Sequence, residues 1–249
     1  MTSPVFNRSE LLLGSDTMQR LADARVIIFG VGGVGSWCAE SLIRTGLSHL
    51  TIVDADKVCP TNINRQMMAT SLTVGQPKVE ALRHRLLEIN PEADITAIHD
   101  IYTADNAASF NLDNYDYIVD AIDSLRDKAA LILHATSLPH SRLYSSMGAA
   151  LKIDPTRISV AEFWQVQGCP LAAALRRRFK RDKTFPRRKF KCVFSPELRQ
   201  NLGTPVDDGA ETFTKTATNG SLVHITAIYG FSLAGLIVND ITSSERKPR

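Results

Sequence analysis

A glycine-rich turn, Gly30-Val31-Gly32-Gly33-Val34-Gly35, carries the clearest chemical signal in the chain. It follows an apolar run at 25–29, typical of a buried strand, and precedes a helical pattern at 36–45. Glycines in such a turn let backbone N–H groups approach a phosphate at the positive end of a helix. A second apolar run at 50–53 ends in Asp54, which is placed to accept hydrogen bonds from ribose hydroxyls. This layout predicts a nucleotide site with five binding residues: Gly30, Gly32, Gly33, Gly35 and Asp54.

Charged and amide side chains after this unit indicate which nucleotide is bound. On its own the glycine turn most often means a dinucleotide redox cofactor. A hydride-transfer site has no need of an arginine and a lysine here, whereas a site that cleaves a triphosphate needs cations for the phosphates and a carboxylate for Mg²⁺. The chain supplies both kinds of group: Asp56, Asn62, Arg65, Gln66, Lys78, Asp120 and Asp123.

The motifs Gly-x-Gly-Gly-x-Gly, Asp54-x-Asp56, Asn62-x-x-Arg65-Gln66, Lys78 and Asp120-x-x-Asp123 together resemble the adenylating domain of the ubiquitin-activating-enzyme superfamily. The resemblance spans residues 5–150 at motif level and, more loosely, the C-terminal helix. It implies that a substrate carboxylate attacks the α-phosphorus of ATP, which releases pyrophosphate and leaves an acyl-adenylate.

The resemblance also implies a role for each residue. Asn62, Arg65 and Lys78 face the triphosphate, and Gln66 orients Arg65. Asp123 binds Mg²⁺, while Asp120 either assists or only caps its strand. Arg8 matches an arginine that reaches into the ATP site of a partner subunit, so a homodimer is expected. The catalytic set is therefore Arg65, Lys78, Asp123 and Arg8, with ATP and Mg²⁺ as cofactors.

Within the superfamily the chain is most similar to the tRNA threonylcarbamoyladenosine dehydratases. The zinc-binding cysteine pairs of most sulfur-carrier enzymes are absent, and the segments 144–148 and 191–196 look like this subfamily. The similarity implies ATP-dependent cyclisation of the modified adenosine in tRNA. The main alternative is an adenylyltransferase for a small ubiquitin-like or sulfur-carrier protein partner, and an ordinary redox enzyme is a third hypothesis.

A basic segment at 176–191 breaks the charge balance of the chain. It holds ten Lys or Arg and one Asp, a net +9 within a chain of net +3, so the remainder is net −6. Phe179, Phe185 and Phe190 are interleaved with these cations, which favours contact with phosphates and bases over a mobile basic loop. The predicted RNA-binding residues are Arg176, Arg177, Arg178, Lys180, Arg181, Arg187, Arg188, Lys189 and Lys191.

Four cysteines, Cys38, Cys59, Cys169 and Cys192, form no Cys-x-x-Cys pair, and the first residues lack a signal-peptide core. A reduced, cytoplasmic protein is therefore expected. Some superfamily members use a cysteine for a covalent intermediate, and Cys169 and Cys192 lie in the irregular region where such a residue could sit, but a buried or incidental cysteine is the favoured interpretation for both.

Alternating apolar runs and helical patterns predict an α/β fold: a Rossmann-like, doubly wound, mostly parallel sheet in one adenylating domain over 1–249. Strands are expected near 25–30, 49–54, 94–99, 116–121 and 142–148, with a further one at 157–163 that could be antiparallel. Helices are expected near 5–22, 33–46, 76–89, 104–110 and 125–138. Residues 165–218 are expected to be an irregular basic crossover. The apolar segment 220–241 favours a core or dimer helix over a membrane span.

Overall fold

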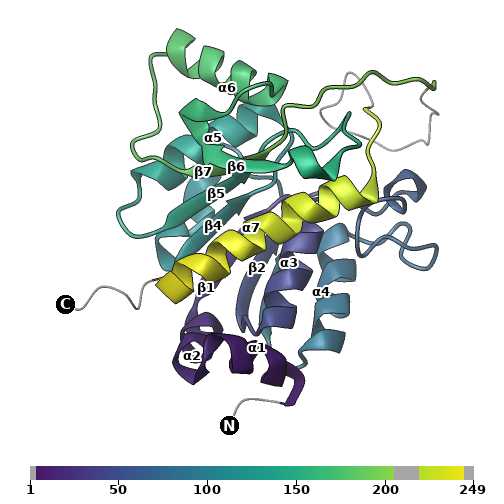
Figure 1. Cartoon of the computed structure of the whole chain (residues 1–249), viewed down its shortest axis with the longest axis vertical. Helices are drawn as coiled ribbons and strands as arrows, with labels where there is room; N and C mark the ends of the chain where they lie inside the picture. Colours follow the sequence, from purple (N-terminus) through teal and green to yellow (C-terminus); the bar gives the residue numbers. More distant parts are fainter. Residues whose placement is uncertain (1–3, 205–218, 244–249) are drawn as a thin grey trace.

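A seven-stranded sheet forms the centre of the computed structural model, which describes residues 4–204 and 219–243 (Figure 1). The strand order is β3-β2-β1-β4-β5-β7-β6, and β6 alone pairs antiparallel, with β7. The predicted mostly parallel sheet is confirmed. The strands are β1 (Arg25–Phe29), β2 (His49–Val53), β3 (Asp94–Ile98), β4 (Tyr117–Asp120), β5 (Arg142–Ser146), β6 (Ser159–Glu162) and β7 (Lys191–Phe194).

The strand order reverses between β1 and β4. From β1 the chain moves to β2 and β3 on one side, and it then returns to place β4 on the other side of β1. Loops that leave the carboxyl ends of β1 and β4 therefore diverge and open a crevice, which is where open α/β sheets bind ligands. The glycine turn follows β1 and the Asp120–Asp123 motif follows β4, so both lie at this crevice.

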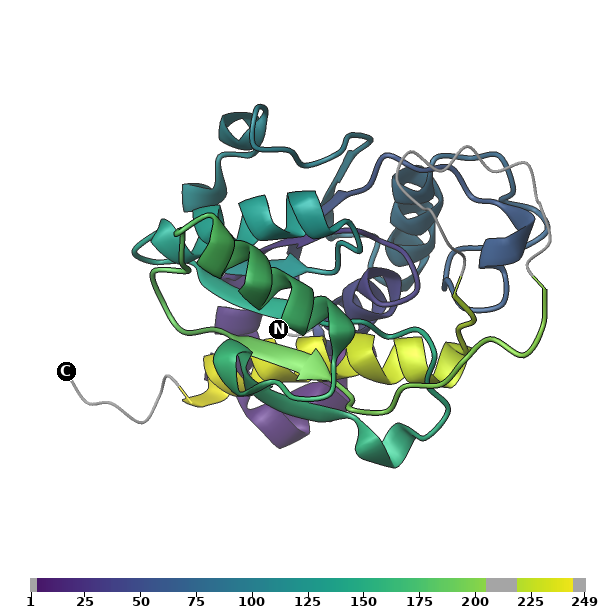
Figure 2. The ribbon, with the colours of Figure 1, turned by 90° about the horizontal axis from the view of Figure 1, so that it is seen from above.

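Helices cover both faces of the sheet (Figures 1 and 2). This explains why β1 is a continuous apolar run, because side chains on both of its faces are buried. One face carries α2 (Ser15–Asp23), α3 (Gly35–Thr45), α4 (Lys78–Ile89) and α7 (Val223–Ser243). The other face carries α5 (Leu125–Ser137) and α6 (Pro170–Arg181).

The long apolar helix α7 packs across α3, as Figure 1 shows. A Cβ at Gly230 would lie 2.5 Å from the carbonyl oxygen of Val34, so this glycine lets the two backbones approach. Among the described residues, α7 is the one helix long and apolar enough to cross a membrane, and half of its most apolar stretch is buried in the protein. Its packing against α2, α3, β5 and β7 agrees with the expected core helix.

Three expectations need correction. The expected helix at 5–22 is two helices, α1 (Asn7–Leu13) and α2, because Gly14 adopts a positive φ of 79° between them. The expected helix at 104–110 is a turn followed by a 3₁₀-helix, Ala107–Phe110. The segment 165–218 is more regular than expected, since its described part contains α6 and β7; residues 205–218 lie outside the described residues.

Candidate active site

The glycine turn fits tightly between β1 and the loop after β4. Gly30 has a φ of 84°, and a Cβ there would lie 2.7 Å from the carbonyl oxygen of Ala121. A Cβ at Gly35 would lie only 1.9 Å from the carbonyl oxygen of Gly30. At Gly33 a Cβ would lie 3.2 Å from Thr226 and 3.3 Å from the Cγ of Arg65. Glycine is therefore required for the turn itself and for the close approach of both neighbours.

The Asp54 carboxylate is fixed against this turn. Its Oδ2 accepts a hydrogen bond from Val31 N at 2.8 Å, and its Oδ1 accepts one from Asp56 N at 2.9 Å. Burial raises the pKa of Asp54, and the nearby Lys78 ammonium opposes that rise. Each carboxylate oxygen keeps a second lone pair, so Asp54 can still accept from ribose hydroxyls.

Lys78 and Asp56 form an ion pair at the same edge. Lys78 begins α4, and its Nζ lies 2.7 Å from Asp56 Oδ2. The lysine side chain is buried whereas the aspartate is about half exposed, so the pair holds an ammonium group at the rim of the crevice. The structure therefore brings these two predicted residues together beside Asp54.

The loop after β2 carries Arg65 toward the loop after β4. The Nη1 of Arg65 donates to Thr61 O and to Asn64 Oδ1, each at 2.9 Å. Trp37 Nε1 donates to the Arg65 carbonyl at 3.0 Å. Burial lowers the pKa of Arg65, while the negative charge of Asp123 raises it. The guanidinium and the exposed Asp123 carboxylate thus interact across the crevice.

Asn62 and Gln66 occupy buried positions in the same loop. Asn62 Oδ1 accepts from Cys59 N at 3.1 Å and so shapes the start of the loop. Gln66 points at the glycine turn, since its Nε2 lies 3.7 Å from where a Cβ of Gly32 would be. Its Oε1 is buried and has no hydrogen-bond partner in the part of the chain that the structure describes. A ligand that offers a hydroxyl or amino group would satisfy this oxygen, which fits a nucleotide in the crevice.

The two aspartates of the Asp120–Asp123 motif have different surroundings. Asp120 is fully buried and its Oδ2 lies 2.8 Å from Lys128 Nζ, which is also fully buried. Ser145 donates to the same oxygen at 2.7 Å, and Lys128 also donates to the Ile122 carbonyl at 3.1 Å. Asp120 therefore anchors the loop that carries Asp123. Sequence reasoning missed Lys128, whose signal was a cation within the apolar pattern at 125–138.

The surroundings of Asp123 suit Mg²⁺. The described residues contain no group of three or more His, Cys, Asp or Glu that could hold a metal ion. Mg²⁺ usually binds through one or two carboxylates together with substrate phosphates and water. A single exposed carboxylate on the loop next to the glycine turn fits that pattern.

Arg8 does not join these residues within one chain. It is exposed on α1, and Phe6 just before it packs near Gly46, at the end of α3 farthest from the glycine turn.

The basic segment divides into two groups of cations. Cations of the first group make hydrogen bonds or ion pairs within the chain. Arg176 donates to the carbonyls of Phe163 and Val166. Arg188 donates to the carbonyls of Ala135, Thr136, Pro139 and Ser141. Arg178 and Arg181 pair with Asp182. The exposed members outside these contacts are Arg177, Lys180, Lys183, Arg187, Lys189 and Lys191.

The three phenylalanines of this segment do not form one exposed surface with the cations. Phe179 and Phe190 are buried and pack on Phe163, with ring centroids at 5.9 and 5.0 Å. The expectation that they contact bases is wrong, because they complete the core beneath α6. Phe185 is 51% exposed and lies beside Trp164, with ring centroids at 6.2 Å.

Three cysteines are buried: Cys38, Cys169 and Cys192. Burial raises the pKa of Cys38 and of Cys192, which keeps both as thiols. Cys59 is partly exposed and its Sγ contacts the Lys57 carbonyl. A covalent role requires a sulfur that a substrate can reach, and those of Cys169 and Cys192 are both buried.

Comparison with known proteins decides the family. A family model described as the ThiF family matches residues 6–239. This chain belongs to the ThiF family. A ThiF-family relative named tRNA threonylcarbamoyladenosine dehydratase, from Escherichia coli K12, is 38% identical over 91% of this chain and 89% of its own length. A relative of the same name from Bacillus subtilis is 33% identical over 95% of this chain and 94% of its own.

A solved ThiF-family structure is similar over nearly the whole chain. The crystal structure of the E. coli tRNA N6-threonylcarbamoyladenosine dehydratase in complex with ATP superposes with a TM-score of 0.82 at 36% identity. The superposition covers 96% of this chain and 94% of that one. The Rossmann-like fold expected from the sequence is thereby confirmed.

Proposed function

We propose that this chain is an ATP-dependent enzyme that cyclises N6-threonylcarbamoyladenosine in tRNA. The observation that carries the proposal is the group of residues at the carboxyl ends of β1, β2 and β4, where Asp54 lies on the glycine turn and Arg65 interacts with Asp123. The relatives' name and the ATP complex support the choice of nucleotide and substrate. One adenylating domain over the whole chain accounts for these features.

The reaction has two steps. A carboxylate oxygen of the threonyl group attacks the α-phosphorus of ATP, the bond from that phosphorus to the bridging oxygen breaks, and pyrophosphate leaves. A nucleophile within the same side chain then loses a proton and attacks the acyl carbonyl. The ring closes and AMP leaves with the former carboxylate oxygen, so the nucleoside loses one water.

The residues of the crevice would bind and orient the nucleotide. Asp54 would accept from the ribose hydroxyls, and backbone N–H groups of the turn would face the phosphates. Arg65 and Lys78 would offset the charge that develops on the phosphorus, with Asn62 and Gln66 shaping the loop. Mg²⁺ bound by Asp123 would neutralise phosphate charge.

Partners follow from the exposed surfaces. Five of the exposed cations, all predicted RNA-binding residues, would bind the tRNA backbone: Arg177, Lys180, Arg187, Lys189 and Lys191. Arg8 would act in the ATP site of a second copy, which makes the enzyme a homodimer. The cytoplasm, where tRNA and ATP are available, would be its compartment.

The test is nucleoside mass spectrometry after incubation of the protein with ATP, Mg²⁺ and tRNA that carries the modification. We expect the modified nucleoside to lose the mass of one water while AMP forms. The alternative is adenylation of a small carrier protein. Unchanged tRNA, together with pyrophosphate exchange that depends on such a carrier, would replace the first function by the second.

A further inference from the structure

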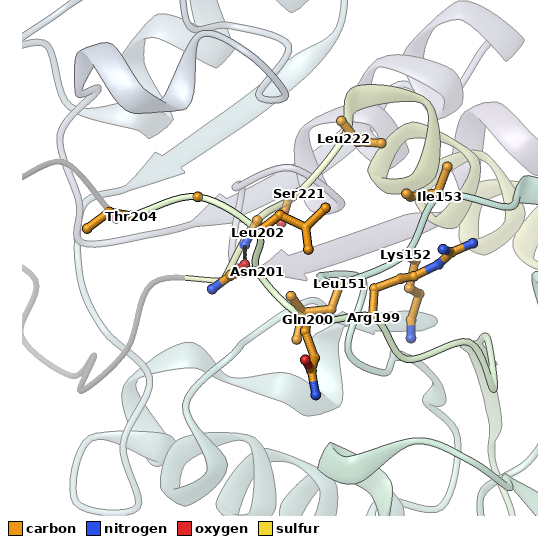
Figure 3. A pocket seen from close by; sticks show the side chains of 12 residues that line it. Leu151, Lys152, Ile153, Arg199, Gln200, Asn201, Leu202, Thr204, Ser221 and Leu222 are labelled. Carbon is orange, nitrogen blue, oxygen red and sulfur yellow. Dashed lines mark hydrogen bonds between the residues drawn. The ribbon is translucent and has the colours of Figure 1, made fainter.

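A pocket of about 390 Å³ lies beside the nucleotide crevice, between the segments 151–153, 199–204 and 220–222 (Figure 3). Backbone hydrogen bonds tie the three segments together: Leu151 N donates to Gly220 O, and Arg199 N donates to Leu151 O, both at 2.9 Å. Asn201 Oδ1 accepts from Gly220 N at 2.9 Å. Leu151 has a positive φ of 59°, a strained conformation for a residue with a side chain, which persists where surrounding contacts fix it. The pocket walls are therefore held in place.

The pocket is connected to the crevice by two short contacts. Asn64, the neighbour of Arg65, donates to the Ser221 carbonyl at 3.0 Å. Leu222 lines the pocket, and its carbonyl accepts from Thr226 N one helical turn further along. Thr226 in turn lies against Gly33. The pocket and the glycine turn therefore meet across the first turn of α7, and a long substituent on a base held in the pocket would extend toward a nucleotide bound at that turn.

A cation in a fixed position forms one side of the pocket. Arg199 Nε lies 2.8 Å from Glu197 Oε1, and the other oxygen of Glu197 accepts from Ile153 N and Asp154 N at 3.0 and 2.9 Å. These hydrogen bonds lower the pKa of Glu197 to about 2, so it stays anionic and holds Arg199. The arginine side chain remains 59% exposed, so it is accessible to a ligand in the pocket. Guanidinium planes stack on unpaired RNA bases.

The other walls combine apolar faces with hydrogen-bonding groups. Leu151, Leu202 and Leu222 contribute the apolar surface, and Gln200 and Ser221 contribute amide and hydroxyl groups. The volume lies within the range of pockets that bind small organic ligands. A flat, partly apolar ligand with polar edges matches these walls, and a nucleobase is such a ligand.

We propose that this pocket holds the modified adenosine of the RNA substrate, unstacked from its neighbours, with its base against Arg199 and its carboxylate directed toward the ATP site. The inference rests on the proposed function and locates the substrate nucleoside within it. The exposed cations near α6 would bind the backbone, whereas this pocket would distinguish a modified from an unmodified nucleotide.

The test fills the pocket and compares two RNAs. Gly203 lines the pocket, and no atom of the described residues lies within 4 Å of a Cβ built there, so Gly203→Trp adds bulk without displacing the described backbone. Glu92→Trp, exposed before β3 at the opposite edge of the sheet, is the matched control. Binding is measured for an anticodon stem-loop with N6-threonylcarbamoyladenosine and for the same stem-loop with adenosine.

We expect the wild type and Glu92→Trp to bind the modified stem-loop about tenfold more tightly than the unmodified one, the scale of one charge-assisted hydrogen bond to the added carboxylate. Gly203→Trp should bind both stem-loops equally, while its affinity for an ATP analogue stays within about twofold of wild type. A preserved preference in Gly203→Trp would overturn the proposal, and so would a selective loss of ATP binding. AMP release by the wild type is scored separately, so that failure of the reaction is distinguished from failure of the pocket.

Discussion

The nucleotide crevice and the basic segment were both predicted from charged residues, but the charged side chains are arranged differently in the two regions. In the crevice, the predicted side chains come together: Lys78 pairs with Asp56, and Arg65 interacts with Asp123. In the basic segment, Arg176 and Arg188 turn inward to backbone carbonyls while their neighbours face solvent. Residue types at defined spacings predicted a site, whereas a count of charges did not separate binding residues from structural ones.

The physical reason lies in the arginine side chain and the helical period. A long apolar stem allows arginine to lie along the protein while its head satisfies carbonyl groups at the end of a helix. Arg188 does this at the end of α5, where four carbonyls accept from it. Helix α6 is amphipathic, with Ala172, Leu175 and Phe179 buried along one face. The strong charge of its other face concealed this pattern.

The largest expected effect concerns Phe179, which the sequence pattern placed on an RNA-binding surface and the structure places in the core. Phe179→Ala removes a fully buried ring from the core and should lower the free energy of unfolding by about 3–5 kcal/mol. Phe185→Ala, at an exposed ring, should change it by about 0.5 kcal/mol or less. Urea unfolding followed by circular dichroism measures both. Equal losses in the two variants would contradict the division between core and surface.

The two aspartates of one motif give the next contrast. Asp123→Ala should reduce Mg²⁺-dependent AMP formation about 10²–10³-fold with little change in stability. The matched control Asp113→Ala alters an exposed carboxylate away from the crevice and should leave the rate unchanged. Steady-state rates over a Mg²⁺ series, paired with thermal unfolding, provide the readout. Full activity in Asp123→Ala would remove this residue from the mechanism.

Substitution of cations within one short stretch gives a smaller effect and tests the basic segment directly. Arg187→Ala with Lys189→Ala removes two exposed charges and should weaken tRNA binding, with the salt dependence reduced by about 0.7 per lost phosphate contact. Arg188→Ala should leave that slope unchanged and instead destabilise the fold by about 1–3 kcal/mol, because its carbonyl partners lose their donor. Binding isotherms over a salt series, with ATP binding as control, separate the two. A reduced slope in Arg188→Ala alone would reverse the assignment.

The sequence predicted most of the sheet and the crevice because each depends on local signals. Strands with both faces buried are continuous apolar runs, and the turn needs glycine where Gly30 and Gly35 meet neighbouring carbonyls. Other contacts depend on packing between distant segments and leave no local pattern. The pairing of Asp120 with Lys128 and Ser145 spans β4, α5 and β5, and the pocket walls join three separate loops. The short strand β7 was not predicted, because its four residues form a strand through pairing with β5 and β6 rather than through a local pattern.

The smallest expected effect concerns Glu197, which follows β7 and accepts hydrogen bonds from the backbone of Ile153 and Asp154. Its pKa is lowered to about 2 from an ordinary value of 4.5, so as the pH falls the unfolded chain takes up a proton before the folded protein does. The stability that this carboxylate contributes is therefore present above about pH 4.5 and is lost as the pH falls toward about 2. Glu197→Gln keeps an acceptor oxygen but removes the charge.

The difference in free energy of unfolding between wild type and Glu197→Gln should consequently shrink as urea titrations move from about pH 6 to about pH 3. Glu92→Gln, on an exposed turn, controls for the loss of one negative charge from the whole chain. If the difference for Glu197→Gln stays constant over this range, then Arg199 and the backbone donors of Ile153 and Asp154 do not stabilise the anion, and the backbone hydrogen bonds between the three segments hold the pocket wall.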